Sequence, residues 1–191
     1  MTKGRLEAFS DGVIAILITI MVIEFHPPHD PKLAGLLPMV PKLLSYLLSF
    51  VFIGIYWNNH HHMLHAVKHV SGSVLWANLH LLFWLSLIPF GTAWLGESNF
   101  AAGPAAAYGV VMLGAGVAYF ILSRRLIALH GPDSTLAAAV GADLKGQVSV
   151  LMYLAAIPLA FVNGLIATAI YVVVAIVWLV PDRRIERQLT K

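Results

Sequence analysis

Proline, glycine and charged residues divide the sequence into apolar runs, each about as long as a lipid bilayer is thick. A helix that crosses a bilayer needs about 20 apolar residues, and in lipid its backbone polar groups must be satisfied internally. Composition agrees, because 59% of the 191 residues are hydrophobic and only 11% are charged. We therefore predict an all-α, polytopic integral membrane protein with one domain over residues 1–191. Its six transmembrane helices are expected at roughly 6–25, 43–63, 74–95, 101–123, 147–162 and 165–180.

Two prolines and one short turn shape the predicted spans. Pro89 lies inside the third span and Pro158 near the end of the fifth. Each removes a helical hydrogen bond, so both helices should bend. The fifth and sixth spans are short, and we expect a tight hairpin between them at Asn163 and Gly164. The opening segment has no second copy in the sequence, which makes this a single-repeat protein.

Basic residues fall almost entirely on one side of the predicted membrane. The side of the termini holds Lys3, Arg5, Lys68, Arg124, Arg125, Lys145, Arg183, Arg184, Arg187 and Lys191. The opposite side holds Lys32 and Lys42. Because cytoplasmic loops collect Lys and Arg, both termini are predicted to be cytoplasmic. We interpret the basic tail from residue 182 to 191 as a solvated stop at the membrane face, with lipid-specific binding as the alternative.

The composition and motifs also exclude several classes of function. A net charge of +3 is too small to indicate nucleic acid binding. The chain has no cysteine, so disulfides, thiolate metal sites and cysteine nucleophiles are excluded. No serine nucleophile motif, pair of catalytic carboxylates or glycine-rich phosphate loop stands out. We predict that the protein is not an enzyme and uses no cofactor.

The first predicted span carries ionisable residues that hydrocarbon tolerates poorly. Arg5, Glu7, Ser10 and Asp11 precede its longest apolar stretch. Asp11 falls at the inner edge of the hydrocarbon or deeper, where a carboxylate needs a partner. The alternative is that Glu7 and Asp11 only favour the positive N-terminal end of a helix dipole at the interface.

Helical spacing divides this span into two faces. One stripe contains Arg5, Phe9, Gly12, Ile16, Thr19, Ile20 and Ile23. Ser10 and Asp11 point about 120° to 140° away from Ile16, and this polar face is expected to bond neighbouring helices. Periodicity alone favours core or lipid contact for the isoleucine stripe, with a pore lining as the alternative.

The first span opens with Arg5, Phe9, Ser10, Asp11 and Gly12. This pattern resembles the signature of the lysosomal potassium channel family, transmembrane protein 175. The run Tyr-Trp-Asn-Asn-His-His at 56–61 resembles a second hallmark of that family. A third hallmark of the family is similar to two segments of this chain, Asn-Leu at 78–79 and Leu-Ser-Leu-Ile-Pro-Phe at 85–90. The last three spans match in number and hydropathy. With its single repeat, the chain is similar to the bacterial and archaeal branch of the family.

The resemblance implies a potassium-permeable channel in which four chains form a homotetramer and the first helix of each lines the pore. It puts the constriction at Ile16, Thr19 and Ile23, on the stripe that also holds Ile20. Isoleucine rings imply an apolar constriction that gates by dewetting. A threonine ring implies coordination of potassium and of other monovalent cations. The chain has no carbonyl selectivity-filter loop of the Thr-Val-Gly-Tyr-Gly type, so selectivity is expected to be modest.

The resemblance also implies a structural polar network that joins the first three helices. Its members would be Arg5, Phe9, Ser10, Asp11, Trp57, Asn58, His60, His61 and Asn78. Their expected role is architectural, since a satisfied network in a low dielectric specifies one arrangement. The implied location is the inner membrane of a bacterial-type cell, with the bilayer and further copies of the chain as partners.

Five histidines lie within ten residues, at His60, His61, His62, His65 and His69. Their i, i+4 pairs have the spacing of metal ligands, but no Asp, Glu or Cys lies among them to complete a tetrahedral site. We therefore expect a polar membrane interface, with pH sensing and zinc or haem binding as alternatives. For the whole chain, the alternatives are a proton or cation leak and a secondary transporter. The repeats and broken helices typical of transporters are not evident.

Overall fold

The computed structural model describes residues 2–141 and 143–179, which form helices and contain no strand. The all-α class expected from the sequence is therefore confirmed. In chain order the elements are α1 (Lys3–Ile23), the 3-10 segment η1 (Leu33–Met39), α2 (Val40–His65), α3 (Gly72–Ser86), α4 (Ile88–Glu97), α5 (Ala102–His130), α6 (Thr135–Val140), α7 (Leu144–Ala160) and α8 (Gly164–Leu179).

Four helical segments of the described chain are long and apolar enough to cross a membrane. They are Lys3–Ile23, Leu33–His65, Gly72–Glu97 and Ala102–His130. α7 is also apolar but has only 17 residues, and the described part of α8 is an apolar helix of 16 residues. At 1.5 Å per residue α7 is about 26 Å long, somewhat shorter than a hydrocarbon core of about 30 Å. A short span is accommodated by local thinning of the bilayer, at modest cost.

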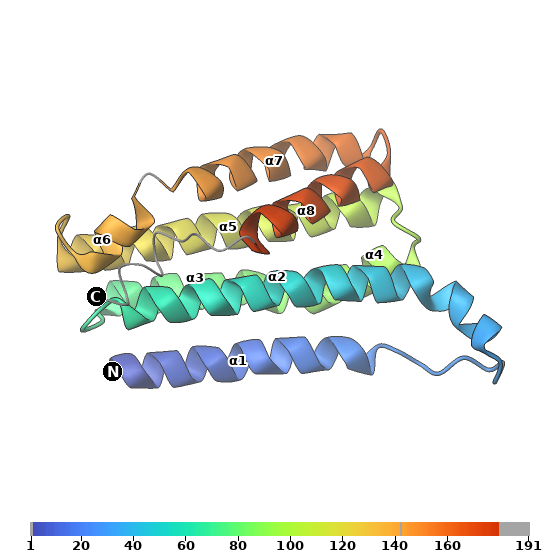
Figure 1. Cartoon of the computed structure of the whole chain (residues 1–191), viewed down its shortest axis with the longest axis horizontal. Helices are drawn as coiled ribbons and strands as arrows, with labels where there is room; N and C mark the ends of the chain where they lie inside the picture. The colour runs from blue at the N-terminus through green and yellow to red at the C-terminus, as the bar shows by residue number, and fades with distance from the viewer. Residues whose placement is uncertain (1, 142, 180–191) are drawn as a thin grey trace.

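The long helices lie side by side as a bundle (Figure 1). α5 packs against α3, α4, α7 and α8, whereas α1 packs against α2, α3 and α4. The start of α1, the end of α2 and the end of α5 lie at the same end of the bundle (Figure 1). α1 therefore stands at the edge of the bundle, and one of its faces is not covered by the other described helices.

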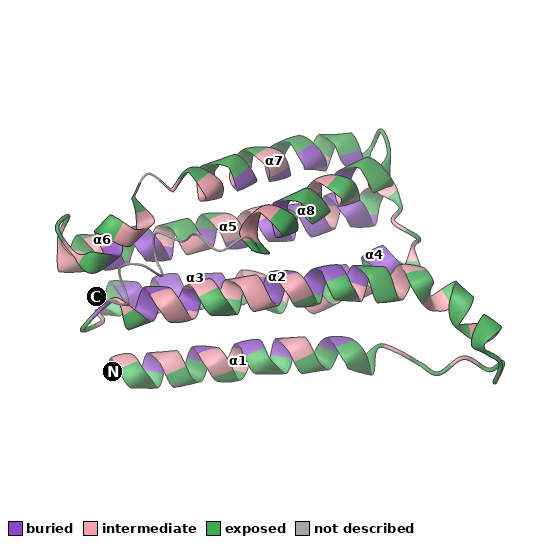
Figure 2. Ribbon diagram, viewed as in Figure 1, coloured by how far each residue is buried: buried purple, intermediate pink, exposed green. Residues whose placement is uncertain are grey.

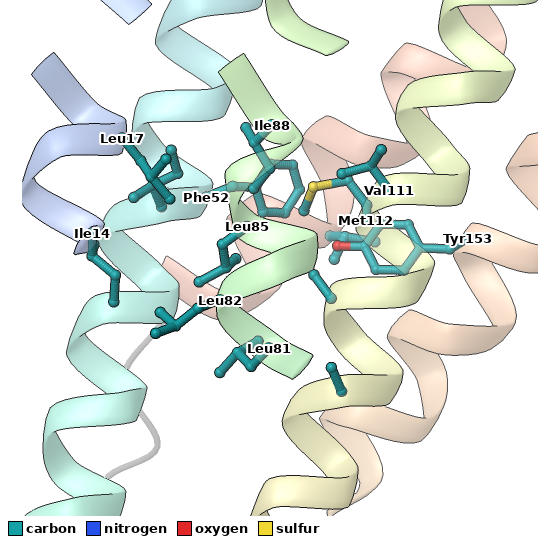
Figure 3. Packing of buried hydrophobic residues seen from close by; sticks show 14 of the residues in the cluster. Ile14, Leu17, Phe52, Leu81, Leu82, Leu85, Ile88, Val111, Met112 and Tyr153 are labelled. Carbon is teal, nitrogen blue, oxygen red and sulfur yellow. The ribbon is translucent and has the colours of Figure 1, made fainter. Parts of the chain in front are cut away.

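The buried core runs through the whole bundle and has members on every α-helix from α1 to α8. Figure 3 labels Ile14, Leu17, Phe52, Leu81, Leu82, Leu85, Ile88, Val111, Met112 and Tyr153. Two glycines of α5 allow its neighbours to approach closely. A Cβ on Gly114 would meet the Trp84 ring of α3, and a Cβ on Gly109 would meet the Tyr171 hydroxyl of α8.

The third apolar segment is broken at Leu87, between α3 and α4. Pro89 explains the break, because it has no N–H to donate to the carbonyl of Leu85 and its ring crowds that carbonyl. The helix resumes at once, with the N–H of Gly91 donating to the carbonyl of Leu87 at 3.0 Å. The bend expected from Pro89 is present as a short interruption two residues before the proline.

Two helical features at one end of the bundle were not anticipated. α5 continues to residue 130, although the fourth span was expected to end at 123. Arg124 and Arg125 end the hydrocarbon segment, but backbone hydrogen bonding continues the helix to Gly131, whose φ of +90° stops it. The six-residue α6 follows, capped by Ser134, whose hydroxyl accepts a backbone N–H at 3.2 Å.

A tight hairpin joins α7 to α8 at the residues that predict it. Asn163 Oδ1 accepts the N–H of Leu165 at 2.8 Å. Gly164 is buried, and a Cβ there would meet the carbonyl oxygen of Phe100. Glycine therefore lets this hairpin approach the connection between α4 and α5. Val180, which ends the predicted sixth span, and the basic tail from residue 182 to 191 lie outside the described residues.

Candidate functional site

α1 has a buried face and an exposed face (Figure 2). Its buried residues are Leu6, Ser10, Ile14, Leu17 and Met21, a spacing typical of a helix packed on one side. Ser10 is the one polar member of this face. The rotation of α1 about its own axis is therefore set by apolar packing and by the bonds that Ser10 makes.

All four residues predicted to line a pore lie on the exposed face of α1. Ile16, Ile20 and Ile23 are 61%, 43% and 71% exposed, and Thr19 is exposed as well. The Thr19 hydroxyl donates within its own helix, lying 3.1 and 3.0 Å from two carbonyl oxygens one turn back. From residue 9 to residue 23 this stripe carries no charged side chain. It is open to lipid, water or another copy of the chain.

A buried chain of hydrogen bonds joins α1 to α3 and α2. Asn78 Nδ2 donates to Ser10 Oγ at 2.9 Å, and Ser10 donates to the carbonyl of Leu6 at 2.8 Å. His60 Nε2 lies 2.7 Å from Asn78 Oδ1. Because that oxygen can only accept, the imidazole proton is assigned to Nε2. Ser10, His60 and Asn78 are fully buried, and His60 Nδ1 has no partner among the described residues.

Two further contacts join α1 to α2 at the partly exposed side of the same interface. Trp57 Nε1 donates to Asp11 Oδ1 at 3.1 Å. His61 Nδ1 lies 3.4 Å from Glu7 Oε1 and forms an ion pair when the imidazole is protonated. Glu7 was not among the residues expected in the network. Its position one helical turn before Asp11, and so on the same face, is the signal that would have found it.

Three of the expected network residues are not brought together with the others. Arg5, Phe9 and Asn58 are exposed, and none of them makes a side-chain hydrogen bond or ion pair with another residue that the structure describes. Within one chain, the polar connection therefore consists of a buried part and a partly exposed part. The buried part is Ser10, Asn78 and His60, and the exposed part is Asp11, Trp57, His61 and Glu7.

A second polar connection, not anticipated from the sequence, lies toward the other end of the bundle. The Thr92 hydroxyl of α4 lies 2.6 Å from Ser49 Oγ of α2, and Ser49 lies 2.9 Å from the Tyr108 hydroxyl of α5. All three side chains are buried. Hydroxyl groups inside apolar runs were the available signal, since buried polar groups must find partners. The core is therefore tied by hydrogen bonds at two levels.

Several of the histidines make ring contacts. His61 and His65 stack with their ring centroids 6.1 Å apart, and His69 lies 4.5 Å from His130. No group of three or more His, Asp or Glu side chains gathers as metal ligands in the parts of the chain described. The alternative of a zinc site in this cluster has no geometric support here.

Comparisons with known proteins agree with the polar signature of α1 to α3. Residues 5–89 match the family model described as "Endosomal/lysosomal potassium channel TMEM175". A potassium channel of Chryseobacterium sp. is 50% identical over 189 residues, which cover 99% of this chain and 98% of that protein. The crystal structure of a lysosomal potassium-selective channel TMEM175 homolog from Chamaesiphon minutus superposes with a TM-score of 0.79 at 29% identity, over 92% of this chain and 95% of that one. Human TMEM175, named an endosomal/lysosomal proton channel, is 34% identical over 96 residues, which are 44% of this chain and 19% of that protein.

The apolar helices and these relatives define an integral membrane protein of the ion-channel class rather than an enzyme. The chain belongs to the TMEM175 family of potassium channels.

Proposed function

We propose that this chain conducts potassium through a pore lined by the exposed face of α1. The observation that carries the proposal is the exposure of Ile16, Thr19, Ile20 and Ile23 on a helix at the edge of the bundle. A pore at a symmetry axis needs a helix whose uncovered face is free of charge. α1 has such a face from residue 9 to residue 23, and the carboxylates of Glu7 and Asp11 are turned toward α2.

The proposed assembly is a homotetramer with four copies of α1 around the axis. Rings of Ile16 and Ile23 would form narrow apolar constrictions that gate by dewetting. The Thr19 hydroxyl donates its proton to its own helix, which leaves the oxygen lone pairs to coordinate a partly dehydrated cation. Selectivity that rests on one hydroxyl ring is modest, so other monovalent cations are expected to pass.

In this proposal the polar connections hold α1 at the correct rotation. The Ser10–Asn78–His60 bonds fix one face inward, which turns Ile16 outward. Asp11 and His61 support the same interface from its exposed side. Arg5, Phe9 and Asn58 are uncovered in the single chain, so their expected places in the network require contacts with neighbouring subunits.

We also propose six membrane spans, with both termini in the cytoplasm of a bacterial-type cell. Gly72–Glu97 acts as one span despite its break, and α7 and α8 act as two short spans. The start of α1 and the end of α5, with their basic residues, lie at one end of the bundle (Figure 1). That arrangement supports a single cytoplasmic face.

Potassium flux from proteoliposomes tests the proposal. Ile16→Asn should raise the flux, because a polar side chain wets the constriction, and Thr19→Ala should change the ratio of potassium to sodium and caesium flux. Leu154→Asn is the matched control, because Leu154 is 50% exposed and belongs to α7, which lies across the bundle from α1 (Figure 1). Unchanged flux in both α1 variants would exclude this face as the conduction path.

A second candidate is proton conduction through the same pore. The support is the name of the human relative, an endosomal/lysosomal proton channel. A pH-sensitive dye inside potassium-free liposomes separates the two activities, since acidification without potassium requires a proton path.

A further inference from the structure

A groove with a volume of about 400 Å³ lies between α2, α5 and α7, beside the end of α8. It opens beside the last described residues of α8, and α5 extends further along the bundle than the described part of α8 (Figure 1). Its walls are rich in aromatic side chains, namely Phe52, Tyr56, Tyr119, Phe120, Tyr153 and Trp178. The volume is within the range of about 300 to 1,000 Å³ that is typical of ligand pockets.

One end of the groove carries a carboxylate. Asp143 lines it from the position just before α7, with a left-handed backbone (φ +46°), and its side chain accepts the N–H of Gly146 at 3.2 Å. Burial raises the pKa of the Asp143 carboxyl, and the hydrogen bond from Gly146 and the charge of Arg124 oppose that rise only in part. Among the described residues, no basic nitrogen lies within ion-pair distance of this carboxylate. A cation in the groove would therefore stabilise its charged form.

The surroundings of Asp143 correspond to the headgroup level of a bilayer. Lys145 lies two residues after it, and the guanidinium of Arg124 lies 4.9 Å from the centre of the Phe120 ring, which lines the groove. Basic residues next to the end of a span mark the membrane interface. From there the groove continues along apolar and aromatic residues of α2 and α7. It thus has a charged end at the interface and an apolar body at hydrocarbon depth.

Gly116 keeps the middle of the groove open. A Cβ at this position would have its nearest neighbours at 3.9 to 4.0 Å, including the hydroxyl of Tyr56. A larger side chain here would fill the groove without a backbone clash. The position therefore offers a way to block the site while leaving the fold intact.

We propose that this groove binds one bilayer phospholipid with a primary-ammonium headgroup, such as phosphatidylethanolamine. The ammonium lies at Asp143, the phosphate lies toward Arg124, and an acyl chain follows the aromatic walls. A primary ammonium donates hydrogen bonds to a carboxylate, and aromatic rings attract cations. A choline headgroup has no N–H to donate, and a glycerol headgroup offers Asp143 no positive charge. The proposal rests on insertion in a membrane but not on the position of the pore.

Native mass spectrometry of the detergent-solubilised protein tests the proposal with three lipids of identical acyl chains, which carry ethanolamine, choline or glycerol headgroups. The wild type should prefer the ethanolamine lipid by about tenfold or more, the ratio that one charge-assisted hydrogen bond supplies. Asp143→Asn should lose this preference while binding the other two lipids as before. Gly116→Leu should weaken all three, whereas Gly103→Leu is the control, because no atom lies within 4 Å of its added Cβ and it does not line the groove.

Two results would overturn the proposal. One is equal binding of the three lipids by the wild type. The other is an ethanolamine preference that persists in both Asp143→Asn and Gly116→Leu, which would move the site elsewhere. Far-UV circular dichroism and the elution volume of each variant show that it is folded. The readout needs no ion flux, so it is independent of the proposed pore.

Discussion

Asn78→Leu tests the buried connection that we propose holds α1 in place. The substitution keeps the number and branching of the side-chain heavy atoms but removes two interhelical hydrogen bonds, one to Ser10 at 2.9 Å and one to His60 at 2.7 Å. Ser10 keeps its bond to the carbonyl of Leu6. His60 loses its only partner among the described residues, because Nδ1 is already unpaired. Interhelical hydrogen bonds in membranes contribute about 0.6 to 2 kcal/mol each, so the free energy of unfolding should fall by about 1 to 4 kcal/mol.

The free energy of unfolding can be measured by titrating the protein from mild detergent into sodium dodecyl sulfate and following tryptophan fluorescence. Ser86→Ala is the matched control on α3, because the exposed Ser86 hydroxyl bonds within its own helix, and its effect should stay within about 0.5 kcal/mol. A double-mutant cycle with Ser10→Ala should give a coupling of about 0.6 to 1.7 kcal/mol. The reasoning would be refuted if Asn78→Leu lowered the free energy of unfolding no more than Ser86→Ala does, and if the effects of Asn78→Leu and Ser10→Ala were additive.

Three further predictions concern packing, the exposed part of the polar connection and pH. Gly109→Ala should destabilise the bundle by about 1 to 3 kcal/mol in the same titration, because its Cβ would meet a tyrosine hydroxyl of α8, whereas Gly103→Ala should be neutral. Trp57→Phe removes the donor to Asp11 and should lower stability by about 0.6 to 2 kcal/mol without changing the potassium to sodium flux ratio; a changed ratio would assign Asp11 to the conduction path. Asp143→Asn should be more stable than the wild type at pH 7. Burial raises the pKa of the folded-state carboxyl, so its contribution to stability is complete below the unfolded pKa of about 3.9 and is lost as the pH rises through the folded pKa. The difference between variant and wild type should therefore vanish near pH 3, and a constant difference across pH would contradict this cause.

The sequence is most informative where a single physical requirement decides the structure. Lipid demands long apolar helices, and the four helical segments that are long and apolar enough to cross a membrane lie where apolar runs predict them. Pro89 must interrupt a helix, and Asn163 with Gly164 must turn the chain, and both effects are present. The end of α5 is different, because Arg124 ends the hydrocarbon segment but nothing at that position ends a helix.

In the candidate site, the sequence predicts which face of a helix a residue lies on, but not which side chain it bonds. Helical spacing alone assigns Ser10 and Ile16 to different faces of α1, and the buried and exposed faces agree with that assignment. Which residue bonds which depends on the packing of three helices, so the pairing of His61 with Glu7 had no signal in α2 itself. The groove is lined by residues of four helices, so it depends on how those helices pack, which no local pattern records.

Cysteine substitution tests the central claim most directly, because the chain has no cysteine of its own. Thr19→Cys and Ile23→Cys would be treated with a charged, water-soluble thiol reagent in proteoliposomes, with Leu154→Cys on α7 as the lipid-facing control. The proposed pore predicts rapid modification and loss of potassium flux at residues 19 and 23, and neither effect at residue 154. Unmodified thiols at residues 19 and 23, or modification that leaves the flux unchanged, would contradict a pore lined by this face of α1.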